Sequence, residues 1–316
     1  MKIKGGNIRN MLRKIFRFGP YVALSNLVLV YGQRFLPAGI VGKINDDRNR
    51  RIQQKVAKYL PDGQAPVGMA RPRVRKPGAV WVCWLQGEEK MPEMVRLCYK
   101  SILANANGHE VVLLTGENYR DYVVMPHIAM RRYREGTLSH AHFADIIRMN
   151  LLAQQGGLWL DATMLLTAPL DERIFESPFF SVKTAPKGYF VSECRWAVFM
   201  LACGRECGIM RRVAKAFENY LNDNDILIDY FLFDHFIDIL YRTDSDVRSI
   251  IDAIPFNNPA IHGLRMILAD DYDERKMEDL TAETGMFKLN TRTYSPKQLD
   301  ANPKSFYNII KKKYLR

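Results

Sequence analysis

The chain has 316 residues, of which 47% are hydrophobic and 25% charged, and its formal net charge is +12. This composition is typical of a folded globular protein with one large or two small domains, and it excludes a disordered chain. The five cysteines are an odd number, contain no Cys-x-x-Cys pair and follow no convincing signal peptide. We therefore expect reduced thiols in a cytosolic protein, and neither disulfides nor a structural zinc site.

The first 45 residues are basic and contain no acidic side chain. Their basic residues are Lys2, Lys4, Arg9, Arg13, Lys14, Arg17, Arg34 and Lys43. The apolar run 21–31 has about half of the roughly 20 residues that span a bilayer. We expect residues 1–60 to form a basic amphipathic helical arm on an anionic membrane surface. The alternative is a basic helix packed on the core. A nucleic-acid partner is not expected, because no recognisable binding module is present.

Residues 61–78 are rich in proline and basic residues and show no apolar periodicity. This pattern predicts a linker between the arm and a main domain over residues 79–316.

The main domain opens with an alternation of strand and helix patterns. Residues 79–87 form a predicted strand, and residues 93–108 form a predicted helix that Asn107-Gly108 ends. Residues 109–118 form a second predicted strand. A strand–helix–strand succession of this length predicts an α/β fold with a mostly parallel sheet. Ligands of such sheets bind at the carboxyl ends of the strands.

The stretch HFADIIRMNLLAQQGGLWLDATMLL, residues 142–166, keeps three charged side chains in an apolar run. The spacing predicts a helix over 141–155, ended by two glycines, and then one buried strand over 158–166. Asp145 and Arg148 are three residues apart and share a helix face. Asp161 and Thr163 share a strand face.

These residue types suit an anionic ligand rich in hydroxyl groups. Arg148 can bind a phosphate, Asp145 can accept hydrogen bonds from sugar hydroxyls, and Asp161 can hold a divalent cation that bridges a diphosphate. The alternative is an internal Asp145–Arg148 ion pair that fixes the packing, with Asp161 as a turn residue.

Residues 142–166 resemble the signature of the DXD-containing sugar transferases, SD-x-x-R-x-x-x-L-x-x-x-G-G-x-Y-x-D-x-D. The most similar branch is the capsular polysaccharide synthesis protein family, and the resemblance covers about residues 79–295. Further matching residues are Trp81, Trp84, Gln86, Gly87, Pro92, Asn118, Tyr119, Tyr122 and Val123, and the segments 228–235 and 286–290.

The resemblance implies a GT-A fold, a Rossmann-like nucleotide-sugar-binding domain, with a UDP-linked donor and a divalent ion, Mn²⁺ or Mg²⁺. By position, Trp84 stacks on the nucleobase, Asp145 and Arg148 bind ribose and donor sugar, and Asp161 binds metal and diphosphate. Thr163 stands where the broader family has its second Asp, so the implied metal ligands are Asp161 and Thr163.

Three further substrate-binding residues are expected. Gln86 belongs to the first-strand motif, Asp229 aligns with a family acid on the acceptor side, and Lys288 is a candidate phosphate contact. The alternatives are a solvated helix face for Asp229 and Asp234 and ordinary surface charge for Lys288. The alternating His140 and His142 are interpreted as helix-start or donor-contact residues and not as zinc ligands, and Trp196 as a core residue.

We therefore expect a cytoplasmic, retaining glycosyltransferase of the hexosyltransferase type, peripheral at the inner face of the plasma membrane. Its acceptor would be a capsular or other surface polysaccharide. Two rival hypotheses are a metal-dependent phosphohydrolase and a non-enzymatic basic module that binds glycan or nucleic acid. Phosphohydrolases of the haloacid dehalogenase type need a second Asp where this chain has Thr163. Steep salt dependence would mark nucleic-acid binding.

Overall fold

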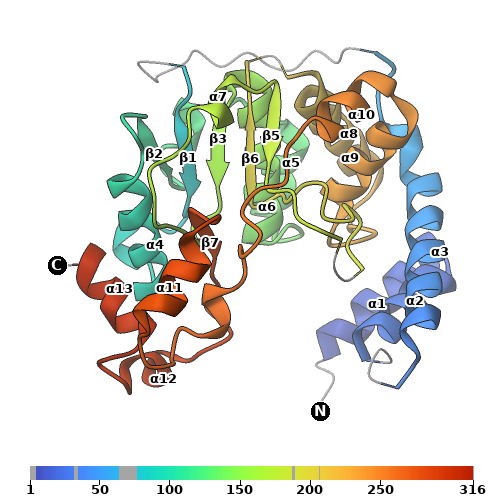
Figure 1. The fold of residues 1–316 in the computed structure, drawn as a ribbon. Helices are drawn as coiled ribbons and strands as arrows, with labels where there is room; N and C mark the ends of the chain where they lie inside the picture. The colour runs from blue at the N-terminus through green and yellow to red at the C-terminus, as the bar shows by residue number, and fades with distance from the viewer. Residues whose placement is uncertain (1–4, 32–34, 64–76, 187–188, 206, 316) are drawn as a thin grey trace.

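The computed structural model describes residues 5–31, 35–63, 77–186, 189–205 and 207–315 (Figure 1). Most of the expected linker at 61–78 lies outside the described residues, as do Lys2, Lys4 and Arg34.

A five-stranded sheet forms the centre of the molecule, in the order β2-β1-β3-β6-β5. Its strands are β1 (Val80–Cys83), β2 (Val111–Leu114), β3 (Gly157–Leu160), β5 (Phe179–Ser181) and β6 (Met200–Cys203). β1 is parallel to both β2 and β3, whereas β6 is antiparallel to β3 and to β5. The predicted α/β fold is confirmed, with a sheet that is mixed and mostly parallel.

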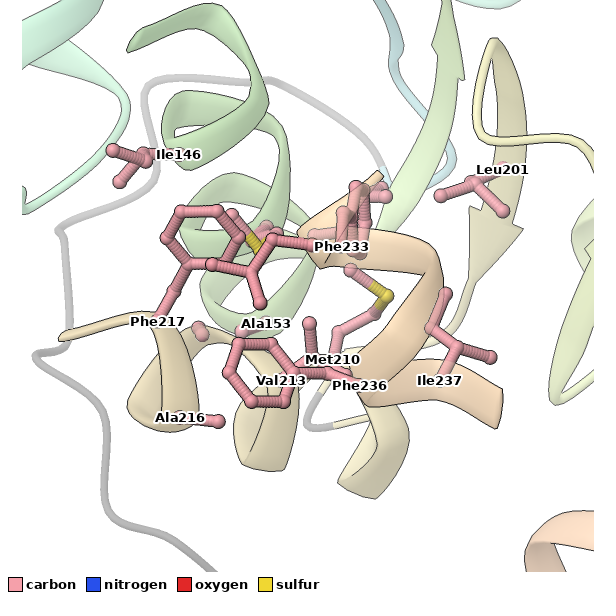
Figure 2. Packing of buried hydrophobic residues seen from close by; sticks show 14 of the residues in the cluster. Ile146, Ala153, Leu201, Met210, Val213, Ala216, Phe217, Phe233, Phe236 and Ile237 are labelled. Carbon is pink, nitrogen blue, oxygen red and sulfur yellow. The ribbon is translucent and has the colours of Figure 1, made fainter. Parts of the chain in front are cut away.

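Alternate residues of the strands face two separate hydrophobic clusters. Trp81 and Cys83 of β1 join the larger cluster, against α6 (His140–Gln155), α8 (Gly208–Asp223) and α9 (Leu232–Thr243). Figure 2 shows the centre of this cluster, where side chains of the three helices interdigitate. Val80 and Val82 join the second cluster, against α4 (Glu93–Ala104) and α7 (Arg173–Glu176). The sheet is therefore covered on both faces, which explains its continuous apolar strands.

A third cluster holds the C-terminal part against α4. It includes the antiparallel pair β4 (Met164–Leu166) and β7 (Met286–Lys288), with α12 (Pro296–Asp300) and α13 (Phe306–Tyr314). The remaining α-helices of the main domain, among the described residues, are α5 (His127–Arg134), α10 (Ser245–Asp252) and α11 (Glu274–Thr281).

The single strand predicted over 158–166 is wrong: the chain turns between β3 and β4. The backbone N–H of Met164 donates to the carbonyl oxygen of Asp161 at 2.8 Å, which closes the turn. Beyond it, β4 leaves the central sheet and pairs with β7. Hydropathy does not reveal this turn, because the residues on both sides of it are buried, Leu160 and Met164 in the same cluster.

The glycine pair that ends α6 permits the close approach of β3 to its neighbours. Gly156 and Gly157 have φ values of +66° and +91°, and the carbonyl of Gly156 accepts a bond from Trp81 Nε1 at 2.8 Å. A Cβ atom on Gly157 would lie 2.4 Å from the carbonyl oxygen of Ala79 on the adjacent strand segment. Any side chain there would push β1 and β3 apart.

Three helices form the N-terminal part: α1 (Gly5–Phe18), α2 (Pro20–Tyr31) and α3 (Ala38–Val56) (Figure 1). α3 packs against α9, α2 packs against α3, and α1 packs against α2. Phe18, Val22 and Ile52 are buried in the larger core cluster. The guanidinium of Arg13 pairs with Asp225 at 2.5 Å. The arm is therefore packed against the main domain. None of the helices in the described part of the chain is both long and apolar enough to cross a bilayer.

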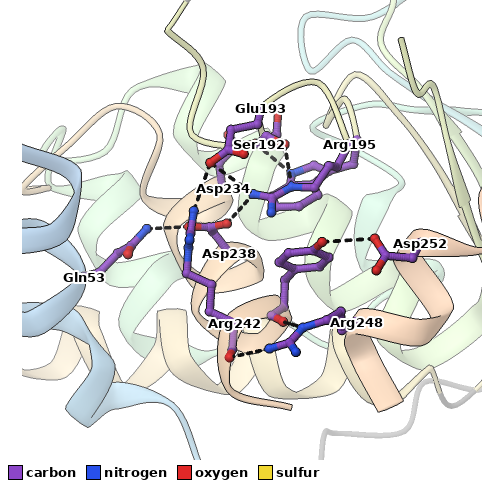
Figure 3. Close-up of polar contacts among 11 residues, drawn as sticks. Gln53, Ser192, Glu193, Arg195, Asp234, Asp238, Arg242, Arg248 and Asp252 are labelled. Carbon is purple, nitrogen blue, oxygen red and sulfur yellow. Dashed lines mark hydrogen bonds and ion pairs between the residues drawn. The ribbon is translucent and has the colours of Figure 1, made fainter. Parts of the chain in front are cut away.

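A polar network fastens α3 to α9 (Figure 3). The carboxylate of Asp238 accepts hydrogen bonds from Gln53 at 2.7 Å, Arg195 at 2.5 Å and Arg242 at 2.7 Å. The Asp238 side chain is 1% exposed, so the two guanidinium groups and the amide compensate its burial.

Candidate active site

The three charged residues of the 142–166 stretch meet at the carboxyl end of β3, where Thr163 and Lys288 join them. Asp161 directly follows β3, and Asp145 and Arg148 lie on α6. Thr163 lies in the turn before β4, and Lys288 ends β7. This is the edge at which ligands of α/β sheets bind.

Both carboxylate oxygens of Asp161 accept hydrogen bonds. Oδ2 accepts from Lys288 Nζ at 2.7 Å. Oδ1 accepts from Trp159 Nε1 at 3.1 Å and from Arg148 Nη2 at 3.3 Å. The Asp161 side chain keeps 28% of its surface exposed, so the carboxylate is held firmly and still reachable.

Arg148 connects the helix to the strand end. Its side chain is 5% exposed. Nη2 donates to Asp145 Oδ1 at 2.9 Å, and Nη1 donates to the carbonyl oxygen of Val198 at 2.6 Å. The guanidinium also lies over the rings of Trp159 and Phe233, 5.0 and 5.6 Å from their centroids. The internal Asp145–Arg148 ion pair, given above as an alternative, is therefore present, and it is part of the same cluster as Asp161.

The two acids of the site have opposite pKa shifts. Burial raises the pKa of Asp145 to about 6, although Arg148 opposes the shift. Burial also acts to raise the pKa of Asp161, but the charges of Lys288 and Arg148 and the hydrogen bonds from Lys288 and Trp159 lower it to about 2. Asp161 is therefore a permanent anion at neutral pH, whereas Asp145 changes charge close to neutrality.

Trp84 lies one residue beyond β1, at the same edge of the sheet as Asp161. β1 and β3 are parallel neighbours with Val82 opposite Leu160, so the residues that follow the two strands lie at the same edge of the sheet. The Nε1 atom of Trp84 is buried and has no hydrogen-bond partner among the described residues. Gln86 follows in the turn and is exposed. The binding roles expected for both residues stay predictions.

Asp229 lies before α9 and is engaged by the N-terminal helices. Its carboxylate forms a buried ion pair with Arg48 of α3, and Oδ1 accepts from the backbone N–H of Phe231 at 2.7 Å. The alternative of a solvated helix face is wrong, because Asp229 and Asp234 are 3% and 8% exposed. The acceptor-side role of Asp229 stays a prediction, and its observed contacts join α3 to the chain just before α9.

Asp234, at the start of α9, accepts a bond from Trp196 Nε1 at 3.0 Å. Burial raises the pKa of Asp234 to about 7, and the nearby charge of Asp145 acts in the same direction. Trp196 is 1% exposed, so its predicted core position is confirmed.

The two histidines at the start of α6 do not converge. Ser139 is the N-cap and accepts from the backbone N–H of His142 at 3.2 Å. The ring of His140 bonds to the hydroxyl of Tyr133, and the ring of His142 bonds to Ser139 and lies 5.3 Å from Tyr230. This arrangement agrees with their interpretation as helix-start residues.

The donor set at Asp161 fits a divalent ion poorly. It offers one carboxylate and the neutral hydroxyl of Thr163, and the Lys288 ammonium bonds to both of these, at 2.7 and 2.8 Å. No group of three or more His, Cys, Asp or Glu side chains suited to a metal occurs among the described residues. The metal implied by the sequence resemblance stays a prediction, and these contacts do not favour it.

Two surface hollows of about 530 and 760 Å³ lie elsewhere, one at α10 and the other beside β7. Neither is lined by Asp145, Arg148 or Asp161. We place the candidate site at the charged cluster because it lies at the carboxyl end of β3, where ligands of α/β sheets bind, and because its acids have shifted pKa values.

Sequence reasoning missed Trp159, which holds Asp161 Oδ1. A signal was available, since residues two apart in a strand point to the same side. It also missed the carbonyl of Val198, for which no side-chain pattern exists.

Comparisons with known proteins give one family. No curated protein matches the chain significantly. A solved structure described as PaToxG Glycosyltransferase is 12% identical, with a TM-score of 0.38, and the match covers 85% of this chain and 96% of that one. The profile described as "Capsular polysaccharide synthesis protein" matches residues 35–310, a wider span than the resemblance in the sequence. The chain belongs to the capsular polysaccharide synthesis protein family.

Proposed function

We propose that this protein is a retaining glycosyltransferase with a GT-A-type domain. It transfers a hexosyl group from a nucleoside diphosphate sugar, specifically a UDP sugar, to a capsular or other surface polysaccharide. The carrying observation is Asp161, held at the carboxyl end of β3 between Arg148 and Lys288. Membership of the capsular polysaccharide synthesis family supports the acceptor class.

The cluster has the chemistry that a nucleotide sugar requires. Arg148 and Lys288 supply positive charge, which stabilises a departing diphosphate when it is placed in advance. Asp145 and Asp161 accept hydrogen bonds from sugar or ribose hydroxyls. Trp84 offers an aromatic ring at the same edge of the sheet, and its indole N–H has no partner within the described part of the chain, which suits a nucleobase.

We further propose that the N-terminal helices contact the anionic inner face of the plasma membrane. The supporting observation is the exposure of large apolar side chains on basic helices and the segment between them: Phe16 is 96%, Phe35 85% and Leu12 57% exposed. Aromatic and aliphatic side chains next to basic residues favour the interface of an anionic bilayer.

The test of the proposed activity is a panel of nucleoside diphosphate sugars. The intact protein is mixed with each sugar, and release of nucleoside diphosphate is measured beside the donor-induced shift of the melting temperature. At least one donor should raise the melting temperature and be turned over, because ligands that bind the folded state stabilise it. A folded protein that neither binds nor hydrolyses any donor, with or without Mn²⁺, would overturn the proposal.

A further inference from the structure

Lys288 occupies the position that the cation of a sugar transferase would need. Its Nζ lies 2.7 Å from Asp161 Oδ2 and 2.8 Å from Thr163 Oγ1. These are the two side chains that the sequence motif aligns with metal ligands. The lysine comes from β7, whose pairing of Lys288 with Met164 fixes it beside the turn.

An ammonium and a divalent ion cannot share this place. A Mg²⁺-sized ion binds carboxylate oxygens at about 2.1 Å, which lies well inside the contact that Lys288 makes. The other oxygen of Asp161 is already engaged by Arg148 and Trp159. A metal would have to displace the ammonium and then tolerate its charge nearby, with only one carboxylate and one hydroxyl as protein ligands.

Lys288 has the capacity to bind a phosphate while it keeps these contacts. An ammonium has three N–H donors, and Asp161 and Thr163 take two of them. The side chain keeps 18% of its surface exposed, and Nζ lies over the ring of Phe199, 5.3 Å from its centroid. The Arg148 guanidinium shares Asp161 with it, so two fixed cations flank one carboxylate.

We propose that the Lys288 ammonium replaces the divalent cation, so that this protein binds the diphosphate of its donor without a metal. The inference rests on the proposed function and deepens it. In the transfer, the bond between the sugar C1 and the diphosphate oxygen breaks and its electron pair stays on that oxygen. A bond forms between C1 and the acceptor oxygen, and the acceptor proton is released with the nucleoside diphosphate. Lys288 and Arg148 stabilise the charge on the departing diphosphate.

The first experiment titrates the intact protein with uridine diphosphate, by calorimetry, once with a chelator and once with Mn²⁺. We expect binding in the chelator, with an affinity that Mn²⁺ changes by less than about threefold, because such a factor is below 1 kcal/mol. Binding that appears only with Mn²⁺ would overturn the inference and leave the proposed function intact. Absence of binding in both buffers would overturn the proposed function itself.

Variants separate the charge of Lys288 from its packing. Lys288→Met should weaken uridine diphosphate in the chelator by roughly ten- to a hundredfold, the range for loss of a charged hydrogen bond. Lys288→Arg keeps the positive charge and should recover part of the affinity. Lys276→Met removes an exposed lysine 3.8 Å from Asp270 and should change nothing. Unaltered binding by a folded Lys288→Met protein would contradict the inference.

A double variant tests the exchange in the opposite direction. Thr163→Asp with Lys288→Ala restores two carboxylates and removes the ammonium, so uridine diphosphate binding should become dependent on Mn²⁺. If the double variant binds equally well in the chelator, the ammonium is not what stands in for the ion.

Discussion

Arg148 Nη2 lies 3.3 Å from Asp161 Oδ1, and this contact joins the middle of α6 to the end of β3. The same nitrogen bonds to Asp145 at 2.9 Å. One guanidinium thus sets the distance between the two acids, so its role in the fold and its role toward a donor cannot be separated by burial alone.

Arg148→Ala should therefore lower both stability and donor affinity. The free energy of unfolding should fall by about 3 kcal/mol, because two acids and a carbonyl lose a buried donor. The variant should also lose most of the melting-temperature increase that a bound donor gives the parent. Melting curves with and without nucleotide sugar measure both effects. Arg131→Ala, an exposed residue of α5, is the control. An unchanged donor-induced increase would mean that Arg148 does not contact the donor.

The buried Asp234 should make stability depend on pH. Its pKa is about 7 in the folded protein, against the ordinary Asp value of 3.8, so between these values the folded state holds a proton that the unfolded state has lost. Stability should fall as pH rises from about 4 to 7 and then level off. Asp145, with a pKa of about 6, contributes in the same direction.

Asp234→Asn should remove its part of this slope, worth at most about 4 kcal/mol for three pKa units. The amide oxygen can still accept from Trp196, so the fold is preserved. Denaturant unfolding at pH 5 and pH 8 checks this prediction. We expect a gain in stability at both pH values, and a clearly larger gain at pH 8 than at pH 5. Parallel curves for parent and variant would show that the carboxyl is ionised throughout.

The Arg48–Asp229 pair should be essential for holding α3 on the main domain. Burial lowers the pKa of Arg48 to about 10, and both side chains are less than a tenth exposed. Arg48→Met should lower the free energy of unfolding by roughly 3–5 kcal/mol, because it leaves Asp229 buried without its partner. Arg50→Met, two residues away, removes a 67% exposed side chain and should cost less than about 0.5 kcal/mol. Equal effects would contradict a structural role of the pair.

Phe16 provides a point test of membrane contact. Deleting the arm would also remove Phe18 and Val22 from the core cluster, so a substitution at an exposed position is cleaner. Phe16→Glu should weaken the affinity of the intact protein for phosphatidylglycerol vesicles, measured by co-sedimentation, by about tenfold or more, since it replaces an inserted ring by a charge. Phe256→Glu, at a residue 71% exposed beyond α10, should bind as the parent does. If both variants bind the vesicles equally well, the N-terminal helical arm does not contact the membrane through Phe16.

The elements that the sequence predicted correctly are those with a single regular period. α4, α6, β1 and β2 occur where their apolar spacing predicts them, and the Gly156-Gly157 pair ends α6 as expected. The bounds differ, because both strands are only four residues long and α4 ends at Ala104, before the Asn107-Gly108 pair that was expected to end it. The turn at 161–163 does not follow from hydropathy, because both of its flanks are apolar, and it entered only through the alternative in which Asp161 is a turn residue.

The long-range contacts of the site depend on pairing that the sequence does not encode locally. Lys288 and Asp161 are 127 residues apart, and they meet only because β7 pairs with β4 and not with the central sheet. The burial of Asp229 likewise depends on an arginine from α3, which lies far from it in the chain.

Asp161→Asn tests the central claim most directly. The amide keeps the size of the side chain and an acceptor for Trp159 but removes the charge between Arg148 and Lys288. Turnover of the nucleoside diphosphate sugar that the parent uses is measured in both proteins, with their circular dichroism spectra as the check on folding. The account predicts a folded variant whose turnover is lower by roughly a hundredfold or more. Full turnover by a folded Asp161→Asn protein would contradict it.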